Sequence, residues 1–203
     1  MKKIFMMAVM AVAALTANAQ NEVGQFTLMP KAGINISKIT GSEAKSKVGF
    51  VGGVEAEYGI AESFGLSFGA LYSMEGAKGD LVVATGNGAS AYLVPDAKVN
   101  LGYINIPILA QYYPVKGLAF KAGIQPAFKV SAKASKDGES AKMKDLGYDV
   151  NAFNLSIPVG ISYEYAKVVL DFRYNIGLTK IVKDSEKGRN STFAITLGYK
   201  FAL

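Results

Sequence analysis

The C-terminal segment from Ser191 to Leu203, STFAITLGYKFAL, alternates between apolar and polar or small side chains almost without interruption. Its apolar positions are Phe193, Ile195, Leu197, Tyr199 and Phe201. Successive side chains of a β-strand point to opposite faces, so this pattern predicts a strand with one apolar and one polar face. An apolar strand face of this length has to be covered, either by a protein core or by lipid.

Earlier segments of the chain repeat the same alternation and are bounded by turn-forming residues. They predict further strands at 26–39, 48–58, 64–74, 99–113, 118–134, 152–165 and 168–179. With the C-terminal segment, the chain is expected to form eight antiparallel strands.

The connections between these expected strands alternate in length. Tight links fall at 59–63, 114–117 and 166–167, whereas long polar links fall at 40–47, 75–98, 135–149 and 180–190. Short turns on one rim and long loops on the other are typical of outer-membrane barrels. We therefore predict an all-β fold, an eight-stranded antiparallel up-and-down transmembrane β-barrel, with both chain ends at the periplasmic rim.

The N-terminus has the pattern of a secretory signal. Lys2 and Lys3 precede an apolar run over 4–15, and the small-residue sequence Ala17-Asn18-Ala19 follows. The apolar run is about a dozen residues, short of the roughly 20 that a spanning helix needs. We expect a signal peptide over 1–19, cleavage before Gln20, and a barrel domain over 20–203 in the outer membrane of a Gram-negative bacterium.

The composition argues against catalysis. The chain contains no Cys and no His, which removes disulfides, thiolate chemistry and the usual general base. Glu55 and Glu57 share a strand face through their i, i+2 spacing, but such pairs are too common to indicate an active site. We predict no enzyme, no catalytic residue, no cofactor and no metal site.

The formal net charge of +6 is spread along the chain rather than clustered. This distribution argues against a nucleic-acid partner. Outer-membrane lipid or glycolipid is the expected neighbour, because basic residues favour anionic surfaces.

The polar faces of the expected strands are rich in Gly, Ser and Asn and carry charges of both signs. Small residues with balanced charges suit the narrow lumen of an eight-stranded barrel. The expected luminal residues are Lys31, Glu55, Glu57, Lys121, Lys129, Glu164, Asp171, Arg173 and Lys200, with Gln111 and Gln125 among them. We interpret them as ion pairs that hold the barrel together; the alternative is a selectivity path for ions.

The opposite, apolar faces carry aromatic residues close to the short turns. Tyr and Phe at such positions are typical of the belt at a membrane interface. The expected aromatic girdle is Tyr58, Phe64, Tyr112, Tyr163, Tyr165, Tyr199 and Phe201.

The segment from Glu75 to Lys98 is the most distinctive long connection. Two apolar stretches flank Gly86-Asn87-Gly88, which predicts a β-hairpin outside the membrane. Such a hairpin could dock a partner chain by strand addition; the alternative is that it only caps the barrel. The candidate docking residues are Leu81, Val83, Asn87, Gly88, Tyr92 and Val94.

Two short motifs carry a family resemblance: Gly33-Ile34-Asn35-Ile36-Ser37 followed by Thr40-Gly41, and Tyr103-Ile104-Asn105-Ile106-Pro107-Ile108 followed by Tyr112-Tyr113-Pro114. With them the chain resembles the PorT-like, "porin family" outer-membrane β-barrel proteins of Bacteroidetes. It also resembles small barrels of the OmpX and OmpA type. The sequence Ala17-Asn18-Ala19-Gln20 is similar to export signals of that phylum. The resemblance implies fold and location, and it implies no catalytic residue.

These observations favour a structural or surface-interaction role. A protein partner in the envelope or outside the cell would then bind through the long loops. Two alternatives stay open at this point. One is a narrow channel for small solutes or ions, and the other is a soluble periplasmic, lipocalin-like barrel with its apolar face turned inward.

Overall fold

The computed structural model describes residues 23–40, 44–84, 91–136, 139–181 and 188–203. The expected signal peptide and its cleavage site before Gln20 lie outside the described residues. Among the described residues, no helix is long and apolar enough to cross a membrane. The strands are β1 Phe26–Thr40, β2 Lys45–Ala61, β3 Phe64–Ala84, β4 Ala91–Asn105, β5 Ile108–Val115, β6 Leu118–Lys136, β7 Glu139–Lys142, β8 Phe153–Tyr165, β9 Val168–Lys180, β10 Arg189–Tyr199 and β11 Phe201–Ala202.

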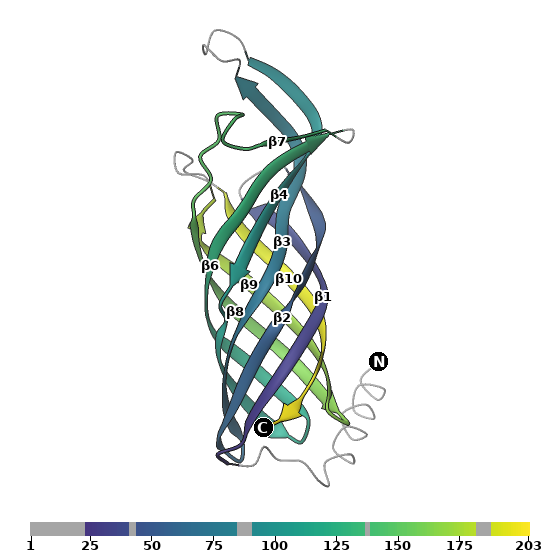
Figure 1. The fold of residues 1–203 in the computed structure, drawn as a ribbon, viewed down its shortest axis with the longest axis vertical. Helices are drawn as coiled ribbons and strands as arrows, with labels where there is room; N and C mark the ends of the chain where they lie inside the picture. Colours follow the sequence, from purple (N-terminus) through teal and green to yellow (C-terminus); the bar gives the residue numbers. More distant parts are fainter. Residues whose placement is uncertain (1–22, 41–43, 85–90, 137–138, 182–187) are drawn as a thin grey trace, which may run out of the picture.

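These strands close into a tilted barrel (Figure 1). Every pairing is antiparallel, and β10 pairs with β1 to close the ring, with Ile195 opposite Ile34. β5 continues the wall strand of β4, and β11 continues that of β10. Counted this way the ring has eight wall strands, so the predicted eight-stranded up-and-down barrel is confirmed.

The break between β4 and β5 falls at Ile106 and Pro107. Proline has no amide hydrogen and therefore cannot donate to a strand ladder. The carbonyl of Pro107 still accepts a bond from the amide of Gly69 at 3.1 Å. The wall therefore stays connected across the interruption.

The two ends of the barrel differ. The turns between β2 and β3, β5 and β6, and β8 and β9 lie at the end where the C-terminus lies (Figure 1). We call this the short-turn end and the opposite rim the long-loop end. At the long-loop end, the expected loop over 75–98 is mostly strand, because β3 and β4 remain paired out to Ala84 and Ala91. The expected loop over 135–149 contains β7, which pairs with β6.

The apolar faces point outward. On β9, Tyr174 and Ile176 are 44% and 40% exposed, whereas Asp171 and Arg173 are 1% and 4% exposed. Because most of the inner face is polar and the large apolar side chains of the wall strands point outward, the soluble lipocalin-like alternative is wrong for this chain: it requires the apolar face inside. The outer surface has the alternation of a lipid-facing barrel.

Gly76 lies on β3 two residues before the last pairing of this strand with β2, at Lys78. Its φ is 132°, a conformation that residues with a side chain rarely adopt. A Cβ at this position would also lie 2.1 Å from the carbonyl oxygen of Val99 on β4. Both constraints require glycine here.

Candidate functional site

Five charged side chains from four strands meet inside the barrel and form the central cluster. They are Lys31 on β1, Glu55 on β2, Lys121 on β6, and Asp171 and Arg173 on β9. None is more than 5% exposed. Alternation along each strand turns these residues inward, and closure of the ring brings them together.

The contacts within the central cluster are shared. Arg173 binds Glu55 with both terminal nitrogens, Nη1 to Oε1 at 2.7 Å and Nη2 to Oε2 at 3.2 Å. Lys121 Nζ, Arg173 Nη2 and Lys31 Nζ lie 2.7, 3.1 and 3.2 Å from Asp171 Oδ2. Lys31 Nζ also lies 3.1 Å from Glu55 Oε2. Each of the two carboxylates therefore bridges several cations, and removing any one partner would leave a buried charge unbalanced.

A second group, the short-turn cluster, lies closer to the short-turn end. Lys200 Nζ lies 3.0 Å from Glu57 Oε2 and 2.8 Å from Glu164 Oε2. Tyr113 donates a hydrogen bond to Glu57, and its hydroxyl oxygen also lies 3.0 Å from Gln111 Oε1. The Lys200 ammonium also lies 5.6 Å from the centroid of the Tyr113 ring.

The two clusters balance each other. The central cluster has three cations and two carboxylates, whereas the short-turn cluster has one cation and two carboxylates. Glu55 and Glu57 are two residues apart on β2, so the clusters occupy neighbouring levels of the lumen. Together they are neutral, as a low-dielectric interior requires.

A third polar group, around Glu75, was not anticipated from the sequence. Ser73 Oγ donates to Glu75 Oε1 at 2.9 Å and Asn105 Nδ2 donates to it at 3.3 Å, and Asn190 donates to Oε2. Lys47 Nζ donates to the main-chain carbonyl of Glu75 at 3.3 Å. The alternation in the sequence ends the predicted strand at residue 74, which places Glu75 in a loop. The strand alternation could have found it, because Glu75 lies an even number of residues after Ser67 and Ser73, whose side chains point inward.

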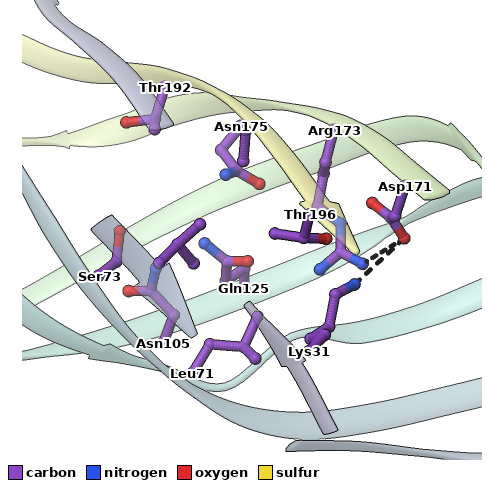
Figure 2. A pocket seen from close by; sticks show the side chains of 12 residues that line it. Lys31, Leu71, Ser73, Asn105, Gln125, Asp171, Arg173, Asn175, Thr192 and Thr196 are labelled. Atoms are coloured by element: carbon purple, nitrogen blue, oxygen red, sulfur yellow. Dashed lines mark hydrogen bonds and ion pairs between the residues drawn. The ribbon is translucent and has the colours of Figure 1, made fainter. Parts of the chain in front are cut away.

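Little space remains between these groups. Figure 2 shows the cavity that lies between the central cluster and the polar residues near Glu75, and its volume is about 20 Å³. Since a water molecule needs about 10–15 Å³ in such a cavity, this space has room for about one. The amide of Gln125 lines it, together with Lys31, Asp171 and Arg173.

Toward the long-loop end of the lumen, apolar side chains of the described residues form a buried cluster. The buried cluster consists of Ala97, Leu101, Tyr103, Ala127, Ala134, Met143, Val150 and Ile181. Met143 and Val150 come from the segment between β7 and β8, which therefore packs into the mouth of the barrel. We call this cluster the plug.

Lys129 was expected among the luminal charges, but it makes no ion pair with a described residue. Its side chain is half-buried, and its Nζ donates to the carbonyl of Val150 in the plug segment. Lys129 therefore ties the β7–β8 connection to β6 instead of joining the charge clusters.

The expected girdle residues lie on the outside, next to the short turns. All are exposed except Tyr163, which is half-buried. Phe64 and Tyr112, opposite each other on β3 and β5, have ring centroids 5.1 Å apart. Tyr199 and Phe201 are 4.8 Å apart.

The candidate docking hairpin exists as a pairing of β3 with β4. Leu81 lies opposite Val94 and Val83 lies opposite Tyr92. Asn87 and Gly88 fall outside the described residues. Beyond Lys78 and Lys98, the pairings of the described residues join these two strands only to each other.

No group of three or more His, Cys, Asp or Glu side chains among the described residues could hold a metal ion. The acidic residues of the lumen are instead engaged with cations and amides.

Solved structures with the same architecture include two bacterial surface proteins. Neisserial surface protein A, NspA, has a TM-score of 0.56 and 17% identity over 87% of this chain and 97% of its own. Ail, the attachment invasion locus protein of Yersinia pestis, has a TM-score of 0.51 and 14% identity over 89% of this chain and all of its own. Another structure of Ail is a complex with the heparin analogue sucrose octasulfate. At these identities the likeness shows the fold alone.

A comparison with curated protein sequences gives no match. The profile of one protein family, described as outer membrane protein beta-barrel domain, matches residues 18–183. This family points to the Gram-negative outer membrane, in which the short-turn end of such barrels faces the periplasm. The match spans most of the barrel, and the chain belongs to the family of outer membrane proteins with a β-barrel domain.

Proposed function

We propose that this protein is a non-conducting, non-enzymatic outer-membrane barrel that acts through its extracellular surface. The observation that carries the proposal is the packing of the lumen by the described side chains. Two balanced charge clusters and an apolar plug lie along the lumen, and the cavity between the central cluster and the residues near Glu75 has a volume of only about 20 Å³. An eight-stranded ring is only just wide enough for its own side chains.

The alternative of a narrow channel would use the same luminal charges as a selectivity path. Their geometry favours the structural role instead. Lys31, Lys121 and Arg173 all hold one carboxylate oxygen of Asp171, and a passing ion would have to displace these contacts.

The proposed interaction surface is the β3–β4 hairpin at the long-loop end. Its two strands extend past the last pairings with β2 at Lys78 and with β6 at Lys98. Their outer edges can therefore accept an added strand from another protein. NspA and Ail, whose names describe a surface protein and an attachment protein, support a surface role by likeness of fold.

We also propose the narrower assignments that the sequence suggested. They are a signal peptide cleaved near Ala19-Gln20, a PorT-like origin in Bacteroidetes, and an aromatic girdle at the periplasmic interface. The two motifs behind the resemblance fall on β1 and on the β4–β5 wall strand, at the inward residues Asn35 and Asn105.

Planar-bilayer recording of the purified full chain tests the main proposal. We expect no conductance steps from the native protein. Arg173→Ala, which opens the central cluster, is the matched variant, and it should conduct more than the native chain if it still folds. Regular steps from the native protein that Glu55→Ala alters would favour the channel and reject the proposal.

Surface crosslinking on intact cells tests the hairpin. The comparison is between the native chain and a chain lacking residues 79–96, with heat-modifiable migration on gels as the control for folding. Loss of specific crosslinked proteins is expected for the deletion. An identical set of crosslinked proteins would remove the docking role.

A further inference from the structure

The outer wall at the long-loop end carries a continuous group of lysines. Lys45, Lys78 and Lys98 lie directly opposite one another on β2, β3 and β4. One row below, Lys133 on β6 lies opposite Lys142 on β7. We call these five residues the outer lysine face.

Alternation along the strands shows that Lys78, Lys98, Lys133 and Lys142 point outward, and Lys45 shares the face of its pairing partner Lys78. Ala77 and Ala97, the neighbours of Lys78 and Lys98, are 2% and 1% exposed and point into the barrel. Ala134, next to Lys133, is likewise buried. All five lysines are exposed. They therefore lie on the same side of the wall as the apolar band.

The outer lysine face begins where the apolar band ends. The described outward apolar residues next to the lysines are Phe50 and Val48 on β2, Met74 on β3, and Phe128 and Val130 on β6. Toward the long-loop end, the lysines follow within a few residues on each of these strands. This is the level at which lipid headgroups meet a barrel embedded in a bilayer.

The charges on this face are not neutralised within the described part of the chain. No salt bridge joins any of the five lysines to a carboxylate among the described residues. Like charges directly opposite each other weaken a sheet. Asp80 and Asp96 lie further along the hairpin, where the amide of Asp96 bonds to Asp80 Oδ1 at 3.1 Å. An external anion would relieve this repulsion.

A cavity of about 280 Å³ adjoins the face. It opens on β6 because β8 pairs with β6 only as far as Phe128, whereas β7 begins to pair at Lys133. Its charged lining residues are Lys129, Lys133, Lys142, Lys144 and Asp149. The volume is close to the lower end of the range for small-ligand sites, about 300 Å³.

We propose that the outer lysine face and this cavity bind the phosphate groups of an anionic glycolipid in the outer leaflet. The lysines meet the phosphates, and the apolar band below them packs against the acyl chains. Phe128 and Phe153, whose ring centroids are 5.7 Å apart, lie on that band directly below the cavity. A soluble anion would gain nothing from this apolar surface, so a lipid is the occupant that both features fit. The proposal goes beyond the surface role above and does not depend on the hairpin.

Calorimetric titration of the full chain in detergent micelles tests this site. The probe is diphosphorylated lipid A, compared with lipid A from which both phosphates have been removed. The test variant combines Lys78→Gln, Lys98→Gln, Lys133→Gln and Lys142→Gln. The control variant combines Lys116→Gln and Lys167→Gln in the short turns, at the opposite rim.

We expect the native chain and the control to bind diphosphorylated lipid A at least about tenfold more tightly than the test variant, given the contribution of each lysine near an anionic surface. Removal of the phosphates should abolish that difference. Unchanged affinity in the test variant, or equal affinity for the two lipids, would overturn the proposal. Sucrose octasulfate binding as tightly as lipid A would identify a soluble polyanion site and would also overturn it. Heat-modifiable migration shows whether each variant folds. The conductance test of the proposed function is separate, because a non-conducting barrel is compatible with either lipid-binding result.

Discussion

The lumen and the outer wall of the long-loop end both carry clustered charge, but they neutralise it differently. Inside, each of the cations Lys31, Lys121, Arg173 and Lys200 lies within 3.2 Å of a carboxylate oxygen. Outside, Lys78 lies between two other lysines with no described ion pair. An interior has no solvent to screen a charge, so the chain must supply the partner itself. The outer wall meets water, ions and headgroups, so its partner can come from the surroundings.

The largest effect is expected from removing a cation of the buried central cluster. Arg173→Ala removes a two-point bond to Glu55 and a contact to Asp171. We expect it to lower the free energy of unfolding by about 3–5 kcal/mol, the usual cost of leaving a buried charge unpaired. Urea titration of the protein in detergent micelles, followed by gel migration, measures this loss.

Lys129→Ala is the control for that prediction, because Lys129 on β6 is also basic but makes no described ion pair. It should cost clearly less than Arg173→Ala. Equal losses for the two variants would mean that the central cluster does not hold the barrel together.

A smaller effect is expected at the junction between the two regions. Gly76→Ala places a side chain at a φ of 132° and close to the Val99 carbonyl. Strain of this kind costs about 1–3 kcal/mol. We expect a corresponding fall in the urea midpoint. Gly65→Ala, whose added Cβ would meet no atom closer than 3.4 Å, should leave the midpoint nearly unchanged, and a similar fall there would refute the argument from strain.

The smallest effect is expected on the outer wall. Lys133→Glu would replace a repulsive pair with Lys142 by an attractive one. We expect stability to rise by about 0.2–1 kcal/mol, the range for cross-strand pairs, while affinity for diphosphorylated lipid A falls. Unfolding midpoints and the lipid titration measure the two changes. A fall in stability would show that Lys133 and Lys142 do not repel each other. Unchanged lipid affinity would show that Lys133 does not contribute to lipid binding.

Much of the fold could be read from local pattern. The strand from 168 to 179 was predicted by alternation alone, and β9 spans Val168–Lys180. Asp171 and Arg173 were assigned to the inner face for the same reason. Side-chain direction in a strand depends only on the position of a residue along its own segment.

The sequence pattern was incomplete where strands continue past the membrane. The alternation ends the predicted strand before Glu75, because polar residues and glycines interrupt it there, whereas the pairing of the two apolar stretches further along was predicted as a hairpin. In the structure, β3 and β4 stay paired to Ala84 and Ala91, because each strand supplies the other's hydrogen bonds without any lipid. The small strand β7 was missed because its four residues show no apolar face.

The sequence by itself determined which side chains share a face of each strand, and with that the polar lumen and the apolar exterior. Only the tertiary structure decided which charges meet. Lys31 bonds to Asp171 across 140 positions of the chain, and Arg173 bonds to Glu55 across 118. Such pairs depend on the register of every strand around the closed ring. Alternation is a property of one strand, whereas register is a property of the whole barrel.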